Sequence, residues 1–105
     1  MIKVSILYPR KPGSRFDADY YTKAHMPLAQ QLLASGVVAT SVEIGMFGAT
    51  PEQPPPFWAI CGFTCASAEA FSAAFLPHAA TLQGDIPNYT DVEPIIQISQ
   101  LSAVS

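Results

Sequence analysis

The order of strand-like and helix-like segments limits the fold of this 105-residue chain more than any other feature. Four segments have the alternation, or the β-branched and aromatic content, that is typical of strands, namely residues 2–8, 37–47, 57–65 and 89–101. Two segments carry apolar residues at helical spacing, namely residues 17–36 and 67–82. The resulting order, β-α-β-β-α-β, predicts an α+β fold: a ferredoxin-like plait of four antiparallel strands with both helices on one face. A chain of this length forms a single domain, residues 1–105.

The first helix has a clear start and an internal proline. Asp17 can cap its N-terminus, and Phe16 can pack against Tyr21 in the first turn. Pro27 has no N–H, so it should bend or break the helix and free a carbonyl group in the preceding turn. We therefore expect His25 to lie at this irregular turn, where the freed carbonyl could fix its tautomer.

Further prolines restrict the second half of the chain. Ser67 is a good cap for the second helix, which Pro77 interrupts one residue before His78. Pro94 cannot donate to a strand ladder, so we expect the last strand to lie at a sheet edge or to contain a bulge.

The low charge of the chain predicts that part of its surface is buried between subunits. Half of the residues are hydrophobic and 12% are charged, against roughly 25% charged residues in an average soluble domain. In the predicted plait the helices cover one face of the sheet and leave an apolar face uncovered, which is unfavourable for a monomer. We therefore expect a homodimer that packs sheet against sheet, a dimeric α+β barrel.

The same composition disfavours several classes of partner. The net charge is −3, whereas a nucleic-acid-binding protein needs an excess of basic residues to displace counterions from phosphates. No apolar run approaches the roughly 18 residues that span a bilayer, and the N-terminus lacks the layout of a signal peptide, so we expect a cytoplasmic protein without membrane contact. Cys61 and Cys65 lie four residues apart in a predicted strand, too far apart for a disulfide. Their spacing favours small core residues over a metal site.

The residues that could carry chemistry lie in the first helix, since the glycine-rich and nucleophile motifs of common enzyme classes are missing. Asp17, Tyr21 and His25 follow one another at four-residue spacing and so share one helix face. A histidine titrates near neutrality and can move protons, and a tyrosine hydroxyl can orient it or stabilise an oxyanion. We interpret Asp17 as a cap and take His25 and Tyr21 as catalytic candidates, while Tyr20 should point away and pack. The alternative is purely structural, with Tyr21 packing and a partly exposed His25 at the helix break.

We expect a mainly apolar pocket between the sheet and the helices of each subunit. Besides Tyr21 and His25, the residues predicted to line it and bind substrate are Tyr8, Trp58, Phe71 and His78. His78 lies on the apolar stripe of the second helix, where a core histidine without a catalytic role is the competing interpretation. We predict no metal, because two histidines alone make a poor metal site. We also predict no cofactor, because the glycine-rich motifs that hold common cofactors are missing. Haem needs only one axial histidine, so haem binding stays an open alternative.

Several short motifs lie near the two ends of the chain: Leu7-Tyr8-Pro9, Lys11-Pro12-Gly13, Phe16-Asp17, Tyr20-Tyr21, His25-Met26-Pro27-Leu28 and Asp85-Ile86-Pro87-Asn88-Tyr89-Thr90, followed by Pro94 and Gln97. Over nearly the whole chain this pattern resembles the EthD family, named for ethyl tert-butyl ether degradation. The resemblance implies a dimeric α+β barrel and makes His25 the first site residue. Family members are often labelled reductases or accompany oxidative degradation systems, and relatives on the same barrel act as monooxygenases, isomerases, cyclases or decarboxylases. Fold alone does not choose among these reactions, and the chain carries no nicotinamide or flavin signature.

The sequence leaves two functional hypotheses. In the first, an EthD-like enzyme acts on a small, largely apolar, oxygen-bearing metabolite of an oxidative degradation or biosynthetic pathway, with His25 moving a proton and Tyr21 holding the oxygen. Such an enzyme would be cofactor-independent or would depend on the redox centre of a partner protein. In the second, a non-catalytic protein binds such a molecule and delivers it to an oxygenase system.

Overall fold

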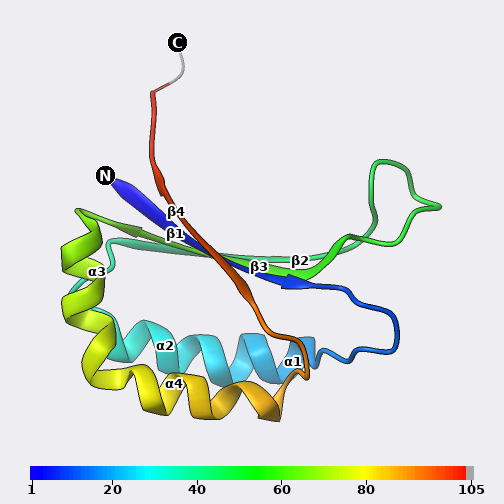
Figure 1. The fold of residues 1–105 in the computed structure, drawn as a ribbon, viewed down its shortest axis with the longest axis horizontal. Coiled ribbons are helices and arrows are strands. Elements are labelled where there is room, and N and C mark those ends of the chain that lie inside the picture. The colour runs from blue at the N-terminus through cyan, green and yellow to red at the C-terminus, as the bar shows by residue number, and fades with distance from the viewer. Residues whose placement is uncertain (104–105) are drawn as a thin grey trace.

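The computed structural model describes residues 1–103, which form a four-stranded sheet with helices on one side (Figure 1). The strands are β1 (Ile2–Pro9), β2 (Ala39–Ile44), β3 (Phe57–Cys65) and β4 (Ile95–Gln100). The first helical segment consists of α1 (Ala18–Tyr20), a π-helical turn (Tyr21–His25) and α2 (Met26–Leu32). The second consists of α3 (Ala68–Phe75), a 3₁₀ turn (Leu76–His78), α4 (Ala79–Asp85) and another 3₁₀ turn (Ile86–Asn88).

The sheet has the strand order β2-β3-β1-β4, and its three strand pairs are antiparallel. β1 lies inside the sheet, where Ile6 is opposite Cys61 of β3 and Ile96 of β4. Both helical segments lie on the same side of the sheet (Figure 1). The predicted α+β fold, a ferredoxin-like plait, is therefore confirmed.

The strand boundaries differ from the prediction where the chain makes other contacts. β3 has the predicted bounds, and β2 is shorter than predicted at both ends. The last strand begins at Ile95 rather than at Tyr89, because the N–H groups of Tyr89 and Thr90 donate to the carbonyl of Ile86. Pro94 therefore precedes β4 instead of interrupting it, and β4 lies at the sheet edge as predicted.

Both helical segments start as predicted. Oδ1 of Asp17 accepts the N–H of Tyr20 at 3.0 Å, and the rings of Phe16 and Tyr21 pack with their centroids 5.0 Å apart. The hydroxyl of Ser67 caps α3 in the same way. These contacts satisfy N–H groups that a helix leaves without a partner in its first turn.

Pro27 widens the first helical segment instead of breaking it. In an α-helix, residue 27 would donate to the carbonyl four residues earlier, which proline cannot do. The chain forms a π-helical turn here, in which the N–H of Met26 donates to the carbonyl of Tyr21, five residues earlier. Such turns are rare in proteins overall, and those that occur often lie at functional sites. The turn keeps the rings of Tyr21 and His25 stacked, with centroids 5.6 Å apart and planes inclined by 15°.

The two faces of the sheet differ in composition. On the face toward the helices, alternate residues of the central strands are buried, among them Val4 of β1 and Phe63 of β3. The opposite face carries the intervening residues of the same strands, among them Lys3 and Ser5 of β1 and Thr64 of β3. The prediction of an apolar uncovered face is therefore wrong, because polar and apolar residues are mixed on it.

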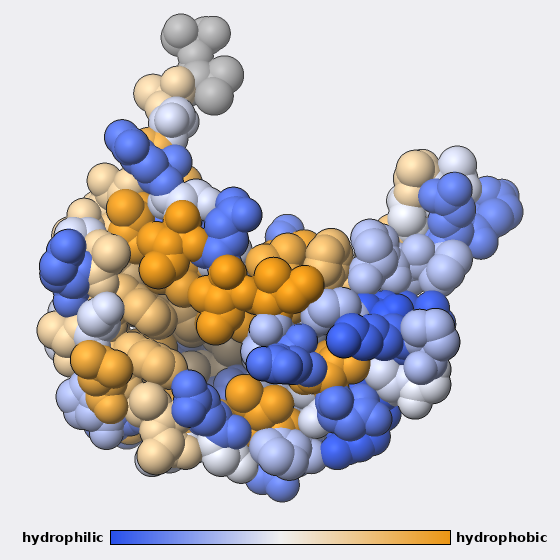
Figure 2. Space-filling model, viewed as in Figure 1, coloured by the Kyte–Doolittle hydropathy of each residue, from blue (hydrophilic) through white to orange (hydrophobic). Residues whose placement is uncertain are grey.

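Exposed apolar residues gather instead on the edge strand β4. Ile95, Ile96 and Ile98 expose 54%, 61% and 56% of their surface. Ile96 and Ile98 are opposite Ile6 and Val4, so they lie on the helix side of the sheet, but no helix covers them. Figure 2 shows hydrophobic side chains on this side of the molecule, next to a hollow between the sheet and the helices.

Candidate active site

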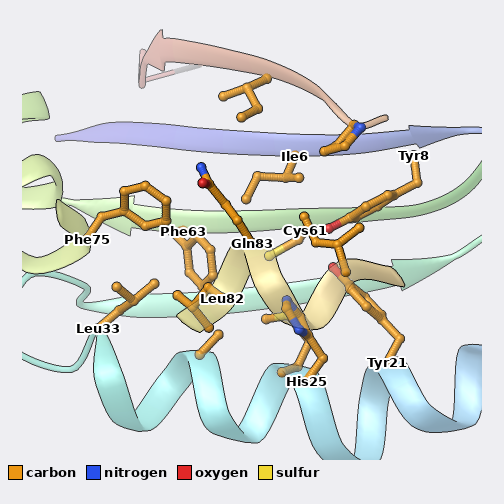
Figure 3. Close-up of a pocket in the computed structure, with 15 residues that line it drawn as sticks. Ile6, Tyr8, Tyr21, His25, Leu33, Cys61, Phe63, Phe75, Leu82 and Gln83 are labelled. Atoms are coloured by element: carbon orange, nitrogen blue, oxygen red, sulfur yellow. The ribbon is translucent and has the colours of Figure 1, made fainter. Parts of the chain in front are cut away.

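A mainly apolar cavity of about 110 Å³ lies between the sheet and the helical segments. A single water molecule needs only about 10–15 Å³ of such space, so the cavity has room for a small organic molecule. Its polar side chains are those of five residues: Tyr8, Tyr21, His25, Cys61 and Gln83. Figure 3 shows them around one space, with β1 and β3 on one side and the helices on the other. Among the described residues that line the cavity, none is an aspartate, glutamate, lysine or arginine.

One side of His25 is fixed by Asp85. His25 ends the π-helical turn and exposes 7% of its surface. Its Nδ1 lies 2.8 Å from Oδ2 of Asp85, the last residue of α4. The other carboxylate oxygen of Asp85 accepts hydrogen bonds from the Tyr20 hydroxyl at 2.6 Å and from the Asn88 amide at 2.9 Å. Asp85 thus joins the two helical segments beside the cavity.

The hydrogen bonds around Asp85 keep it ionised. Burial by itself raises the pKa of this carboxyl group, but the hydrogen bonds from Tyr20, Asn88 and His25 outweigh burial and lower its pKa. An ionised carboxylate only accepts hydrogen bonds, so Nδ1 of His25 carries a proton. In the neutral imidazole, Nε2 is then the nitrogen with the free lone pair, which is the tautomer that a general base needs.

Two buried tyrosines extend the hydrogen-bonded network beyond Nε2 of His25. The Tyr89 hydroxyl lies 3.4 Å from Nε2 and 2.6 Å from the Tyr8 hydroxyl. Tyr89 is completely buried, and Tyr8 nearly so. Burial raises the pKa of both side chains, so both hydroxyls stay protonated at neutral pH.

Tyr21 and Cys61 belong to the same part of the cavity. The hydroxyl of Tyr21 points toward Tyr8 and Cys61 (Figure 3). Burial raises the pKa of Tyr21, and it raises the pKa of the Cys61 thiol to about 11. The Tyr21 hydroxyl can therefore donate to a ligand oxygen. The Cys61 thiol is protonated at neutral pH, which makes it a poor nucleophile.

Three of the residues predicted to line the pocket, His25, Tyr21 and Tyr8, meet in this cavity. Asp85 and Tyr89 were not among the sequence candidates, although they fix and extend the contacts of His25. Both belong to the motif Asp85-Ile86-Pro87-Asn88-Tyr89-Thr90, and that motif is the signal that could have located them.

Tyr20 packs and does not line the cavity, as predicted, but it also has a polar contact that the sequence did not indicate. Its ring stacks on that of Tyr89, with centroids 6.4 Å apart, and its hydroxyl donates to Asp85. Tyr20 therefore supports the carboxylate that orients His25.

Trp58, Phe71 and His78 lie outside the cavity, so the prediction that they line it is wrong. The indole N–H of Trp58 donates to the Ser14 hydroxyl at 2.9 Å, and the Arg10 guanidinium lies 5.0 Å from its ring centroid. Phe71 packs against other phenylalanine rings. His78 lies in the 3₁₀ turn after α3, where it is half-buried but does not border the cavity.

Residues 1–103 contain neither a group of side chains suited to bind a metal ion nor a helix that could span a membrane. No three histidine, cysteine or acidic side chains in this range gather closely enough to hold a metal ion. None of its helices has both the length and the apolar character needed to cross a bilayer. Cys61 and Cys65 are free thiols, each buried, as their spacing predicts.

The fold and the sequence together define an EthD domain. The family model of this domain matches residues 14–93, a range that includes His25, Asp85 and Tyr89. The chain therefore belongs to the EthD family, as the motifs predict. A comparison with curated proteins gives no match.

Solved structures agree with this assignment. An EthD-like protein from Ralstonia eutropha JMP134 is 46% identical, with 94% of this chain and 89% of that one covered and a TM-score of 0.89. An ethyl tert-butyl ether degradation family protein from Bacillus halodurans C-125 is 15% identical, with coverage of 97% and 99% and a TM-score of 0.67. A dimeric ferredoxin-like protein from an uncultured marine organism is 10% identical, with coverage of 100% and 98% and a TM-score of 0.56. The last two are similar to this chain in fold alone.

Proposed function

We propose that this protein binds a small, mainly apolar molecule with a carbonyl oxygen and that His25 moves a proton on it. The observation that carries the proposal is the 2.8 Å contact between Nδ1 of His25 and Asp85 at the wall of the cavity. The contact leaves Nε2 available as the base, and the carboxylate stabilises the imidazolium that forms when Nε2 takes a proton.

The lining of the cavity supports this class of ligand. A charged molecule would lose its hydration there without gaining an ion pair, because the described lining residues include no permanently charged side chain. The hydroxyl of Tyr21 and the amide of Gln83 offer hydrogen bonds to a ligand oxygen. A hydroxyl that donates to an oxygen on which charge develops stabilises the transition state as well as the bound ligand.

Proton exchange on simple ketones tests the proposal. Cyclohexanone, acetophenone and acetylacetone each carry an acidic C–H next to a carbonyl group, and NMR in D₂O follows the loss of that C–H signal. We expect saturable exchange with at least one of them. His25→Ala should lower the rate at saturation by about a hundredfold or more, while the affinity measured by calorimetry changes little.

The matched control is His78→Ala, which removes the other histidine, outside the cavity. It should exchange the ketones at the wild-type rate. Unchanged exchange in His25→Ala would contradict the proposal, as would the absence of both binding and exchange with all three ketones. Binding without exchange, equally strong in His25→Ala, would identify a non-catalytic binding protein instead.

We further propose that the protein is a homodimer. Its charged residues are few, and the isoleucines of β4 are more than half exposed in the single chain. Met46 and Phe47 in the loop after β2 are also exposed, and one structure of the same fold is that of a dimeric protein. Sedimentation equilibrium at micromolar concentration should give twice the mass of the 11.2 kDa chain. A monomer under these conditions would overturn this proposal.

A further inference from the structure

A chain of hydrogen bonds leaves the cavity at one point and returns to it at another. His25 and Tyr8 both line the cavity, whereas Tyr89, which connects them, is completely buried and lies behind the lining. The connecting distances are 3.4 Å from Nε2 of His25 to the Tyr89 hydroxyl and 2.6 Å from there to the Tyr8 hydroxyl. The first of these is long, as is common for catalytic hydrogen bonds in a protein without its ligand.

The protonation state of His25 sets the direction of this chain. While Nε2 is unprotonated, it accepts from Tyr89, Tyr89 accepts from Tyr8, and the Tyr8 oxygen is free to accept a proton from the cavity. When Nε2 holds a proton, it donates to Tyr89, Tyr89 donates to Tyr8, and the Tyr8 hydroxyl donates into the cavity. A proton that enters at one end is therefore matched by a proton that leaves at the other.

We propose that this chain makes the protein a keto–enol tautomerase for small, uncharged ketones. This inference rests on the proposed function, because His25 must first act as the base. The Tyr89 hydroxyl first turns its proton from Nε2 to Tyr8, which frees the single lone pair of Nε2, and Nε2 then takes the proton of the C–H bond next to the carbonyl group. The electron pair of that bond forms the C=C bond, and the π pair of the carbonyl group moves to its oxygen.

The relay then completes the reaction without any other reactant. The oxygen takes a proton from Tyr8, Tyr8 takes one from Tyr89, and Tyr89 takes one from Nε2 of His25. All three side chains return to their starting protonation states, and the ketone has become its enol. The reverse reaction uses the same steps, starting with the enol O–H donating to Tyr8.

The burial of the two tyrosines supports a concerted transfer. Burial raises the pKa of Tyr8 and of Tyr89, so an isolated phenolate on either would be costly. A transfer in which each hydroxyl receives a proton as it gives one away avoids that state. The apolar lining favours a substrate whose two tautomers are both uncharged.

Ketonisation of acetylacetone enol tests the relay. Acetylacetone is stored in cyclohexane, where the enol predominates, and diluted into buffer, where loss of the enol ultraviolet absorption follows its conversion to the ketone. We expect catalysis by the wild-type protein and a loss in kcat/KM of about tenfold or more in Tyr89→Phe and in Tyr8→Phe. Tyr89→Phe keeps the ring and removes only the connecting hydroxyl.

Hydrogen exchange on the same compound separates a relay from a structural role. Exchange at carbon in D₂O needs the base but not the return of the proton to oxygen, so Tyr89→Phe should retain it while losing ketonisation. An equal loss of both activities, or unchanged ketonisation, would overturn the relay. Exchange without ketonisation in the wild-type protein would also overturn it, yet leave the proposed function of His25 standing. If the wild-type protein catalyses no exchange at all, both the relay and the proposed function of His25 are overturned.

A measurement on the unsubstituted protein serves as a second test, in case Tyr89→Phe does not fold. The ketonisation rate is measured in mixtures of H₂O and D₂O. Because the relay moves several protons in one step, a plot of the ketonisation rate against the deuterium fraction of the solvent should be curved. A straight line, typical of a single moving proton, would contradict the relay.

Discussion

Asp85→Asn is expected to lower the rate of His25-dependent proton exchange by about 10²–10⁴-fold, as much as amide replacement of the carboxylate costs other enzymes with an Asp–His pair. The carboxylate accepts the proton of Nδ1 at 2.8 Å and leaves Nε2 as the base. An asparagine NH₂ group in its place can donate to Nδ1 instead. Nε2 would then carry the proton and could not accept another one from the ligand. Exchange on the ketones, measured at saturation, checks this expectation.

The control for Asp85→Asn is Asp19→Asn, which makes the same chemical change at an exposed aspartate of α1. Asp19→Asn should keep the wild-type exchange rate. A loss of less than about threefold in Asp85→Asn would place the base elsewhere, because so small an effect is below that of a lost general base.

The stability of Asp85→Asn should depend on pH in a defined direction. The pKa of Asp85 is lower in the folded protein than in the unfolded chain, so its ionised form stabilises the fold above about pH 4 and this contribution is lost as the pH falls further. Urea unfolding should therefore find Asp85→Asn less stable than the wild type at pH 7. The difference should shrink as the pH falls through the folded-state pKa of Asp85. A difference that is the same at pH 7 and at pH 3 would contradict the hydrogen-bonded carboxylate.

Tyr21→Ala is expected to give a large loss of stability, about 3–5 kcal/mol in the free energy of unfolding. The Tyr21 ring is 99% buried and lies within 5.6 Å, between centroids, of four other rings: Tyr8, Phe16, His25 and Tyr89. Truncation would leave a cavity in the cluster that joins the first helical segment to β1. A domain of this size loses about 4–8 °C in Tm per kcal/mol, so thermal unfolding by circular dichroism measures the effect.

Tyr21→Phe is the matched control, because it keeps the ring and removes the hydroxyl. It should unfold within about 1 kcal/mol of the wild type, the value of a single hydrogen bond, and affect ligand binding more than stability. If Tyr21→Ala were as stable as Tyr21→Phe, the aromatic cluster would not hold the helix on the sheet as described.

Local patterns predicted the parts of this fold that depend on neighbouring residues. Alternation in residues 2–8 located β1, and Asp17 and Ser67 marked the starts of the helical segments. The consequence of Pro27 was harder to predict, because a proline can end, bend or widen a helix. Which of these occurs depends on packing against the sheet. The π-helical turn that stacks Tyr21 and His25 could therefore not be read from spacing alone.

The residues that contact His25 were predictable only where they share its helical segment. Tyr21 and His25 lie one turn apart, so their spacing paired them, but Asp85 is 60 residues from His25. The residues next to either one in the sequence do not indicate that the two helical segments pack together. His78 illustrates the opposite error: its spacing matched an apolar stripe and it is half-buried, yet it does not reach the cavity that other residues of the second helical segment line. Contacts between distant segments depend on tertiary packing, which sequence periodicity does not encode.

The tautomer of His25 is the most direct test of the central claim, that Asp85 prepares this side chain as a base facing the cavity. Long-range ¹H–¹⁵N NMR of the imidazole rings distinguishes a protonated nitrogen from one with a free lone pair, and His78→Gln assigns the two histidines. Neutral His25 should carry its proton on Nδ1, with Nε2 unprotonated, and Asp85→Asn should reverse this. A proton on Nε2 in the wild-type protein would contradict the account, because His25 could then neither take a proton from a ligand nor start the relay through Tyr89.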